Sequence, residues 1–247
     1  MRAPAIFALL AVLGGTAGAS ELFLFEKDRG RVELRLGFGS VEAHVLQNAS
    51  TEREWDASGY RPALVMSFTG KGPSSDFRFR GLFSETQSVD DADVDLDSYD
   101  LRTRVGYGWD LKRRTVLSVL GALSYRSWKS HVDSEAENTA YDSEVICLGG
   151  YAHLRSGLVK RRLFLSAEIG TEFPVEGNAA YAEVETSRLN GEMILESRVG
   201  LEWRFGEYSW LTLGVAWEQA ELDFGGNPNT VDQINSMMFE VGLSLSF

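Results

Sequence analysis

The chain has 247 residues, and 24 Lys and Arg against 36 Asp and Glu give it a formal net charge of -12. A chain of this length suits one domain, and its acidity excludes nucleic acid as a partner. Cys147 is the single cysteine, so an intramolecular disulfide is excluded as well. We interpret Cys147 as a small residue packed in a strand rather than as a reactive thiol.

Residues 1–19 have the pattern of a secretory signal peptide. Arg2 precedes an apolar run over residues 5–13, and small residues then lead to an Ala-x-Ala site at Ala17–Ala19. The run is too short for a membrane-spanning helix, which needs about 20 apolar residues, and no later stretch is long enough. We therefore predict a signal peptide over 1–19 and an exported domain over 20–247, whose net charge becomes -13 once Arg2 is removed.

The last segment, Met237–Phe247, alternates strictly between apolar and polar or small residues. One face carries Met237, Phe239, Val241, Leu243, Leu245 and Phe247, and the other carries Met238, Glu240, Gly242, Ser244 and Ser246. A transmembrane β-strand needs such alternation over about 9–11 residues. This strand, with its C-terminal Phe, resembles the final strand of bacterial outer-membrane proteins. The resemblance implies the outer membrane of a Gram-negative cell and recognition by the barrel-assembly machinery.

The same alternation recurs, with varying clarity, in nine earlier segments. These lie at about 32–40, 60–69, 75–84, 99–109, 115–129, 141–155, 163–173, 192–205 and 210–221. The pattern blurs after Ser40, where a bulge would shift the register. In 141–155 two sets of apolar residues compete for the outer face; we favour the set of Ile146, Leu148 and Leu154, which leaves Glu144 and His153 inside.

The connections between these segments alternate between long and short. Outer-membrane barrels have long external loops, short periplasmic turns and an even number of strands. We therefore predict an all-β fold, a closed antiparallel transmembrane β-barrel of ten strands, monomeric and in contact with outer-membrane lipid and lipopolysaccharide. The alternative is a soluble, lipocalin-like barrel, which needs the apolar face inside and would leave Arg102, Arg104, Arg198 and Arg204 outside.

Aromatic residues recur at both ends of the apolar face and predict two membrane-interface girdles. The periplasmic girdle comprises Phe68, Phe77, Tyr107, Trp109, Trp203, Phe205 and Phe247. The outer girdle comprises Tyr60, Phe83, Tyr99, Tyr125, Phe173, Trp217 and Phe239.

Charged residues occupy the predicted inward face of most strands. The set comprises Arg35, Arg78, Arg80, Arg102, Arg104, Glu168, Glu172, Glu196, Arg198, Glu202, Arg204, Glu218 and Glu240. Because an unpaired buried ion costs several kcal/mol, we expect a network of salt bridges that fills the lumen. A small gated, porin-like channel is the alternative.

An acidic stretch follows the third segment, with Asp91, Asp93, Asp95 and Asp97 at every second position. In an extended chain these carboxylates share one face, so weak binding of calcium or magnesium is one interpretation and a solvated acidic loop is the other. The spacing is not that of an EF-hand, because Leu96 and Arg102 stand where Gly and Glu are required. The sequence calls for no other cofactor.

Catalytic motifs are sparse. The ten-strand layout is similar to that of the omptin proteases, and Asp91 and Asp93 match their Asp pair in placement, but the connection over 174–191 has no histidine for their Asp-His pair. A lipid hydrolase that uses His131 beside Ser130 or Ser134 is another possibility. We expect a non-enzymatic surface or structural protein, either a narrow channel or a loop-based ligand binder, with an omptin-like protease or lipid hydrolase at the extracellular rim as the alternative.

Overall fold

The computed structural model describes residues 30–47, 51–68, 71–89, 92–112, 115–134, 138–159, 162–181, 184–188, 192–222 and 230–247. The predicted signal peptide lies outside these residues. Nearly all of the described chain is β-strand, and no described helix is long and apolar enough to cross a membrane. The strands are β1 (Gly30–Gln47), β2 (Thr51–Phe68), β3 (Gly72–Ser84), β4 (Gln87–Val89), β5 (Ala92–Lys112), β6 (Thr115–Ser134), β7 (Asn138–Val159), β8 (Leu163–Tyr181), β9 (Val184–Arg188), β10 (Ile194–Arg204), β11 (Ser209–Glu221) and β12 (Thr230–Ser246).

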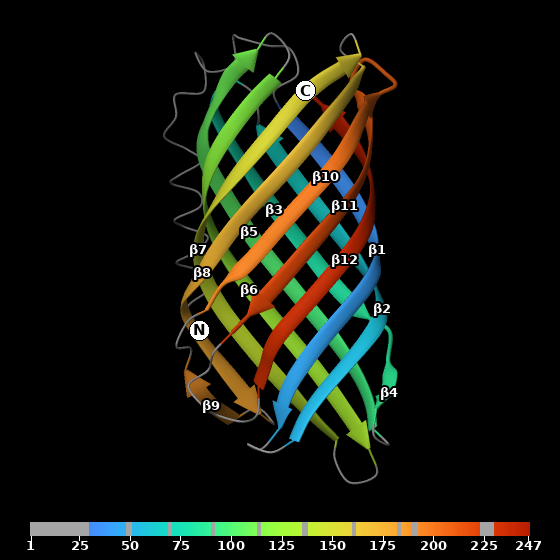
Figure 1. Ribbon diagram of the computed structural model, residues 1–247, viewed down its shortest axis with the longest axis vertical. Helices are drawn as coiled ribbons and strands as arrows, with labels where there is room; N and C mark the ends of the chain where they lie inside the picture. Colours follow the sequence, from blue (N-terminus) through green and yellow to red (C-terminus); the bar gives the residue numbers. More distant parts are fainter. Residues whose placement is uncertain are drawn as a thin grey trace.

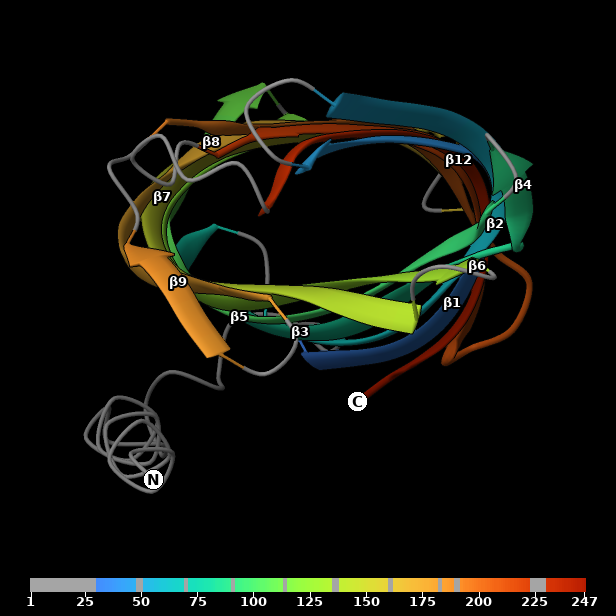
Figure 2. The same ribbon diagram turned by 90° about the horizontal axis from the view of Figure 1, so that it is seen from below.

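The strands form one closed antiparallel barrel, tilted in Figure 1 and seen as a ring in Figure 2. Strand β12 pairs with β1, and β10 pairs with both β11 and β8, so the ring has no open edge. The short strands β4 and β9 add to β5 and β8 at one end and are not part of the ring. The predicted closed barrel of ten strands is therefore confirmed.

Both ends of the described chain lie at the same end of the barrel. The backbone N–H of Phe247 donates a hydrogen bond to the carbonyl of Gly30 at 2.9 Å. At this end the connections between successive barrel strands are short, and we call it the short-turn end. The opposite end, at the bottom of Figure 1, carries the long hairpins, and we call it the hairpin end.

Alternation along each strand separates an apolar exterior from a charged interior. On β12, Leu243 is 60% exposed while Glu240 is 8% exposed. The soluble, lipocalin-like alternative is wrong, because Arg102 is fully buried while Val199 is 55% exposed. An apolar exterior over the middle of a closed barrel is the surface that lipid requires.

The preferred face of the segment over 141–155 is confirmed, because Leu148 is exposed and Cys147 is buried. The inward placement of Glu144 is wrong. Its side chain is exposed, since it lies two residues before Ile146 and so shares the outward face of β7.

The strands are longer than the alternation predicts. Most of the stretches predicted as long polar loops, at 47–59, 85–98, 130–140 and 174–191, belong to strands that extend the sheet toward the hairpin end. The physical reason is visible on β5, where Val94 and Leu96 alternate in sequence with Asp93, Asp95 and Asp97. The two apolar side chains are fully buried on the inner face, and the aspartates lie on the outer face. Beyond the lipid the outer face is polar, but the inner face still packs a core.

The predicted bulge after Ser40 is also misplaced. The pairing of β1 with β12 runs without a shift through Ser40 and changes register between His44 and Val45, near the hairpin end.

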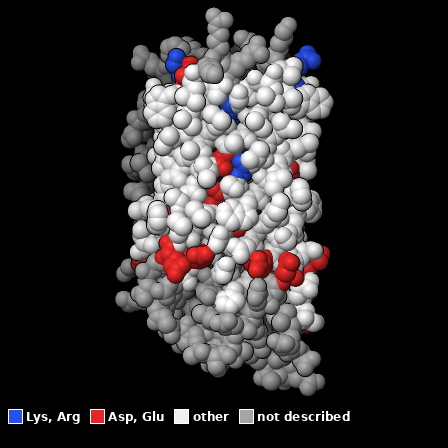
Figure 3. Space-filling view, viewed as in Figure 1, with Lys and Arg blue, Asp and Glu red and all other residues white. Residues whose placement is uncertain are grey.

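The two predicted aromatic groups lie on the outside. Toward the short-turn end, Phe68 contacts Phe247 edge to face, with ring centroids 5.9 Å apart, and Tyr107 and Trp109 lie 5.1 Å apart. Toward the hairpin end, Phe83 contacts both Tyr60 at 5.1 Å and Tyr99 at 5.8 Å. Figure 3 shows a belt that is mostly uncharged, with a few charged atoms visible near its middle and carboxylates gathered along its lower border.

Candidate functional site in the barrel lumen

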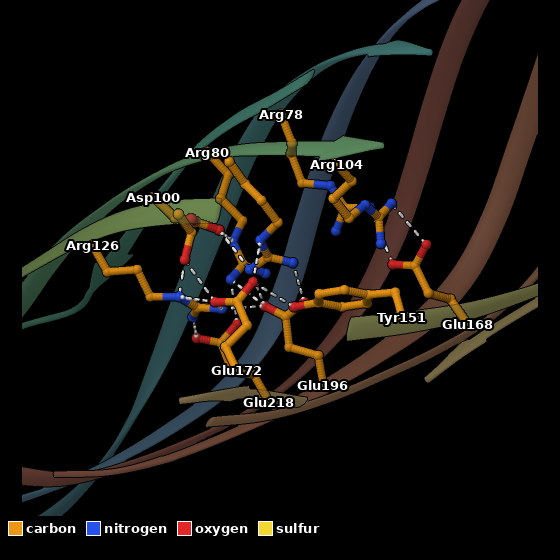
Figure 4. A network of polar contacts seen from close by, with 12 residues as sticks. Arg78, Arg80, Asp100, Arg104, Arg126, Tyr151, Glu168, Glu172, Glu196 and Glu218 are labelled. Carbon is orange, nitrogen blue, oxygen red and sulfur yellow. Dashed lines mark hydrogen bonds and ion pairs between the residues drawn. The ribbon is translucent and has the colours of Figure 1, made fainter. Parts of the chain in front are cut away.

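The middle of the lumen is filled by what we call the central charge cluster, drawn in Figure 4. It comprises Arg80, Arg102, Arg126, Asp100, Glu172, Glu196 and Glu218. The guanidinium of Arg102 donates to both carboxylate oxygens of Glu196, at 2.5 and 2.7 Å. Arg126 donates to Glu172 and Glu218, both at 2.9 Å. Because these side chains come from strands around the ring, the cluster bridges the barrel from wall to wall.

Tyr151 of β7 supports the cluster from one side. Its hydroxyl lies 2.8 Å from Glu172 and 3.1 Å from Glu196 and donates toward these carboxylates. Its ring lies under the guanidiniums of Arg102 and Arg104, at 4.9 and 4.6 Å. An aromatic face beside desolvated guanidiniums adds a cation–π attraction to the ion pairs.

A second set of ion pairs fills the lumen between the central charge cluster and the short-turn end. Glu168 accepts from Arg78 at 3.1 Å and pairs with Arg104 at 2.9 Å. Glu202 joins Arg31 at 2.7 Å and Arg155 at 3.1 Å. Further pairs include Arg35 with Glu33 at 2.8 Å, Arg104 with Asp76 at 2.6 Å, and Arg198 with Glu240 at 2.6 Å.

Toward the hairpin end the interior is mostly apolar, and the hydroxyls of Ser130 and Ser143 are buried among its apolar side chains. The buried hydrophobic residues there form one cluster, which we call the outer apolar core: Val41, Ala43, Ala57, Leu82, Val94, Leu96, Trp128, Tyr141, Val145, Cys147, Ala179, Ile194, Ala220, Leu222, Ile234 and Met238. The predicted packing of Cys147 in a strand is confirmed, because its thiol is free and buried in this core.

The structure brings together most of the predicted lumen set. Arg35, Arg78, Arg80, Arg102, Arg104, Glu168, Glu172, Glu196, Arg198, Glu202, Glu218 and Glu240 all take part in the ion pairs above. Arg204 lies elsewhere: it donates to the carbonyl of Glu207 in the turn after β10, and its guanidinium lies 5.5 Å from the ring of Trp210.

Sequence reasoning left several members out of the set. These are Arg31, Glu33, Arg61, Asp76, Asp100, Arg126, Tyr151 and Arg155. Alternation along β3 could have predicted an inward side chain at Asp76, because Asp76 shares one face of the strand with Arg78 and Arg80. Half of the outer apolar core, including Ala57, Val94 and Ala179, lies on segments predicted as loops, where the sequence pattern predicts no inward face.

Small cavities lie among the charged side chains of the lumen. Three of them have volumes of about 70, 20 and 10 Å³, and charged residues line each of these. The central charge cluster, with Arg102 and Glu172 fully buried, occupies the cross-section between them.

The acidic stretch lies on the outside of the barrel near the hairpin end. Asp91 falls outside the described residues. Asp95 lies 2.8 Å from Nδ1 of His131, and the hydroxyl of Ser88 donates to Asp93 at 2.5 Å. The pKa of the Asp97 carboxyl is raised, first by its partial burial and then by the charge of Asp95.

Among the described residues, no group of three or more His, Cys, Asp or Glu side chains is arranged to hold a metal ion. Weak binding of calcium or magnesium by the aspartates stays a prediction. A calorimetric titration with calcium that shows no heat of binding would contradict it. The pairing of His131 with Ser130 as a hydrolase site is wrong, because Ser130 is buried inside the barrel while His131 is exposed on its outer face.

No protein-family model and no curated protein sequence matches the chain. Among solved structures, the translocator domain of the autotransporter NalP from Neisseria meningitidis is similar, with a TM-score of 0.52 and 13% sequence identity over 99% of this chain and 98% of that chain. The outer membrane protease OmpT from Escherichia coli is similar with a TM-score of 0.54 and 11% identity, over 93% of this chain and 100% of that chain. The fold is that of a bacterial outer-membrane β-barrel.

An outer-membrane barrel has its short turns in the periplasm and its long connections outside the cell. The short-turn end, with Gly30 and Phe247, is therefore the periplasmic end, and the hairpin end is extracellular. The fold and its apolar belt locate the protein in the bacterial outer membrane.

Proposed function

We propose that this protein is a closed, non-conducting outer-membrane barrel that serves as a surface or structural protein rather than as a channel. One observation carries the proposal: the central charge cluster spans the lumen, with Arg102 and Glu172 fully buried. An ion could pass only if several paired, buried charges separated together, and breaking buried pairs costs about 3–5 kcal/mol for each partner removed.

The outer apolar core supports the same proposal. It lies between the central charge cluster and the extracellular end, with Val94, Leu96 and Ile234 at most 1% exposed. A packed, mostly apolar plug opposes the entry of ions because their hydration would be lost without compensation. Two different barriers thus lie in series along the lumen.

The hairpin end is the surface through which such a protein would act. Strands β5, β6 and β7 continue beyond the outer aromatic girdle and carry Asp93, Asp133 and Asp142 on their outer face. Recognition commonly uses the segments that a rigid scaffold displays. The acidic display favours a cationic ligand or host surface, and binding that survives trimming of all the hairpins would contradict this role.

The outer face of the barrel supports two further partners. The lipid-facing C-terminal strand, which ends in Phe247, supports recognition by the barrel-assembly machinery. The outer aromatic girdle supports contact of a monomeric barrel with lipopolysaccharide.

Conductance of the reconstituted full-length mature chain tests the closed barrel. We expect no stepwise current in planar bilayers under conditions in which flotation of liposomes shows that the barrel has inserted. The variant with Arg102→Ser, Glu196→Ser and Trp128→Ala keeps the net charge, empties part of the central charge cluster and opens a space in the outer apolar core, so it weakens both barriers and serves as the positive control. Stepwise conductance of the parent chain would contradict the proposal.

A hydrolase at the extracellular rim is the second candidate, favoured by the exposed Asp95–His131 pair with its 2.8 Å contact. A carboxylate that orients a histidine is a recurring base arrangement, and one protein of similar fold is the outer membrane protease OmpT. Peptides and lipid A are the substrates to assay. Turnover that His131→Gln abolishes and Lys129→Gln preserves would support this candidate, and no turnover of either substrate would remove it.

A further inference from the structure

A cavity of about 70 Å³ lies in the lumen between the central charge cluster and the periplasmic end. Six arginines and four carboxylates line it, so its lining carries more positive than negative charge at neutral pH. Glu240, which lines the adjoining cavity, pairs with Arg198. Counting Glu240 as a fifth carboxylate, the six arginines still exceed the carboxylates by one charge.

Buried donors without a hydrogen-bond partner line this cavity. They are Nε of Arg35, Nε of Arg78 and Nη1 of Arg104. Arg78 is 6% exposed and Arg104 is 3% exposed, so bulk water does not satisfy them. A buried guanidinium nitrogen left without an acceptor is costly, and an anion that accepts from it removes the cost.

The protein's own carboxylates hold these arginines by their other nitrogens. Arg78 donates through Nη2 to Glu168, and Arg104 uses Nη2 for Glu168 and Nε for Asp76. Figure 4 shows Arg78 and Arg104 lying beside Glu168. Two guanidiniums thus share the carboxylate of Glu168, which holds them in place. Nε of Arg78 and Nη1 of Arg104 remain without an acceptor.

Two other unpartnered atoms near the cavity lie against the barrel wall. Oε1 of Glu33 occupies the place that a Cβ on Gly242 would take. Nη2 of Arg198 lies 3.5 Å from the Cβ position of Gly214. They define the wall of the cavity rather than its ligand atoms.

We propose that this cavity is a binding site for a small oxyanion of the size of sulfate or phosphate, held by Arg35, Arg78 and Arg104. A water molecule needs about 10–15 Å³ of such space, so the cavity has room for several waters or for one tetrahedral oxyanion with water. Water can satisfy the spare donors, but only an anion also balances the excess positive charge.

The periplasm supplies the anion. Arg155 is 29% exposed and Arg31 is 14% exposed in their side chains, and both line the cavity on its periplasmic side. On the other side the central charge cluster closes the lumen. The site therefore binds a solute from the periplasm without passing it across the membrane, and it is compatible with a closed barrel.

Crystals of the parent protein soaked in selenate test the site directly, because selenium scatters anomalously and selenate has the shape of sulfate. We expect an anomalous peak within hydrogen-bond distance of Nε of Arg78 and Nη1 of Arg104. Ordered water alone at these nitrogens, at saturating selenate, would overturn the proposal.

Equilibrium dialysis with radiolabelled sulfate tests it in solution, with the full chain in detergent. Arg78→Gln should weaken binding by about tenfold or more, because one charge-assisted contact is lost. Arg162→Gln removes a charge from an exposed position near the same end of the barrel and should leave binding unchanged. Equal binding by the parent and by Arg78→Gln, with both barrels folded, would also overturn the proposal.

Discussion

Arg102 of β5 and Glu196 of β10 face each other across the lumen and form two parallel hydrogen bonds of 2.5 and 2.7 Å. Glu196 also accepts from Arg126 at 3.0 Å and from the hydroxyl of Tyr151 at 3.1 Å. One carboxylate thus ties together strands that are far apart in the sheet. Such a contact fixes the shape of the barrel as well as filling it.

Replacing Glu196 therefore tests how far the central charge cluster stabilises the barrel. Glu196→Ala leaves Arg80, Arg102 and Arg126 with one fewer carboxylate among them, and we expect it to lower the free energy of unfolding by about 3–5 kcal/mol. Urea unfolding in lipid vesicles measures this loss. Glu207→Ala, at an exposed turn, is the control and should change stability by less than about 0.5 kcal/mol. Equal effects of the two substitutions would show that the cluster is not stabilising.

The depth of Leu243 in the lipid belt gives a second prediction. Leu243 lies midway between Phe239 of the outer girdle and Phe247 of the periplasmic girdle and is 60% exposed. Leu243→Arg should cost about 2–4 kcal/mol in vesicles, since it places a charge at the middle of the hydrocarbon. Met237→Arg, at the level of the outer girdle beside its register partner Trp217, should cost about 0–1 kcal/mol. A cost that does not depend on depth would contradict the proposed position of the membrane.

The barrel itself could be predicted from the sequence because lipid imposes a strict rule on each strand. Leu243 and Glu240 on β12, or Phe79 and Arg80 on β3, fall on opposite faces by alternation alone. The rule does not apply beyond the lipid, because there Asp93 and Asp95 are as acceptable on the outer face of a strand as they are in a loop. The extracellular extension of the sheet was therefore missed.

The partners within the lumen could not be predicted from alternation. Register and closure decide that Arg102 meets Glu196, from a strand 94 positions away, rather than Asp76 on the neighbouring strand. Arg204 shows the opposite error, because it follows the inward alternation of β10 but ends among turn carbonyls. Alternation assigns a face to a residue and says nothing of its depth.

Close contact between neighbouring strands at Gly106 gives a third prediction. A Cβ on Gly106 would collide with the carbonyl oxygen of Val119, on the paired strand β6. Gly106→Ala should therefore destabilise the barrel by about 1–3 kcal/mol, because a backbone atom cannot easily move away. Gly121→Ala is the matched control, since its nearest contact would be an ordinary 3.8 Å from Val105. Thermal unfolding in detergent should separate the two variants, and similar transition temperatures would contradict the predicted clash.

The outer apolar core gives the last prediction, through two tryptophans that differ in the face they occupy. Trp128 is 2% exposed and belongs to the core, whereas Trp217 is 38% exposed on the lipid side. Trp128→Ala leaves a cavity among close-packed neighbours and should lower the free energy of unfolding by about 3–5 kcal/mol.

Trp217→Ala should cost less, because lipid can fill the space that the side chain leaves. Urea titration of both variants in the same vesicles gives the comparison. Trp128→Ala should remain non-conducting despite its lower stability, since the central charge cluster still closes the lumen. If the two substitutions proved equally costly, the extracellular part of the interior would not be the packed core that the burial of Trp128 indicates.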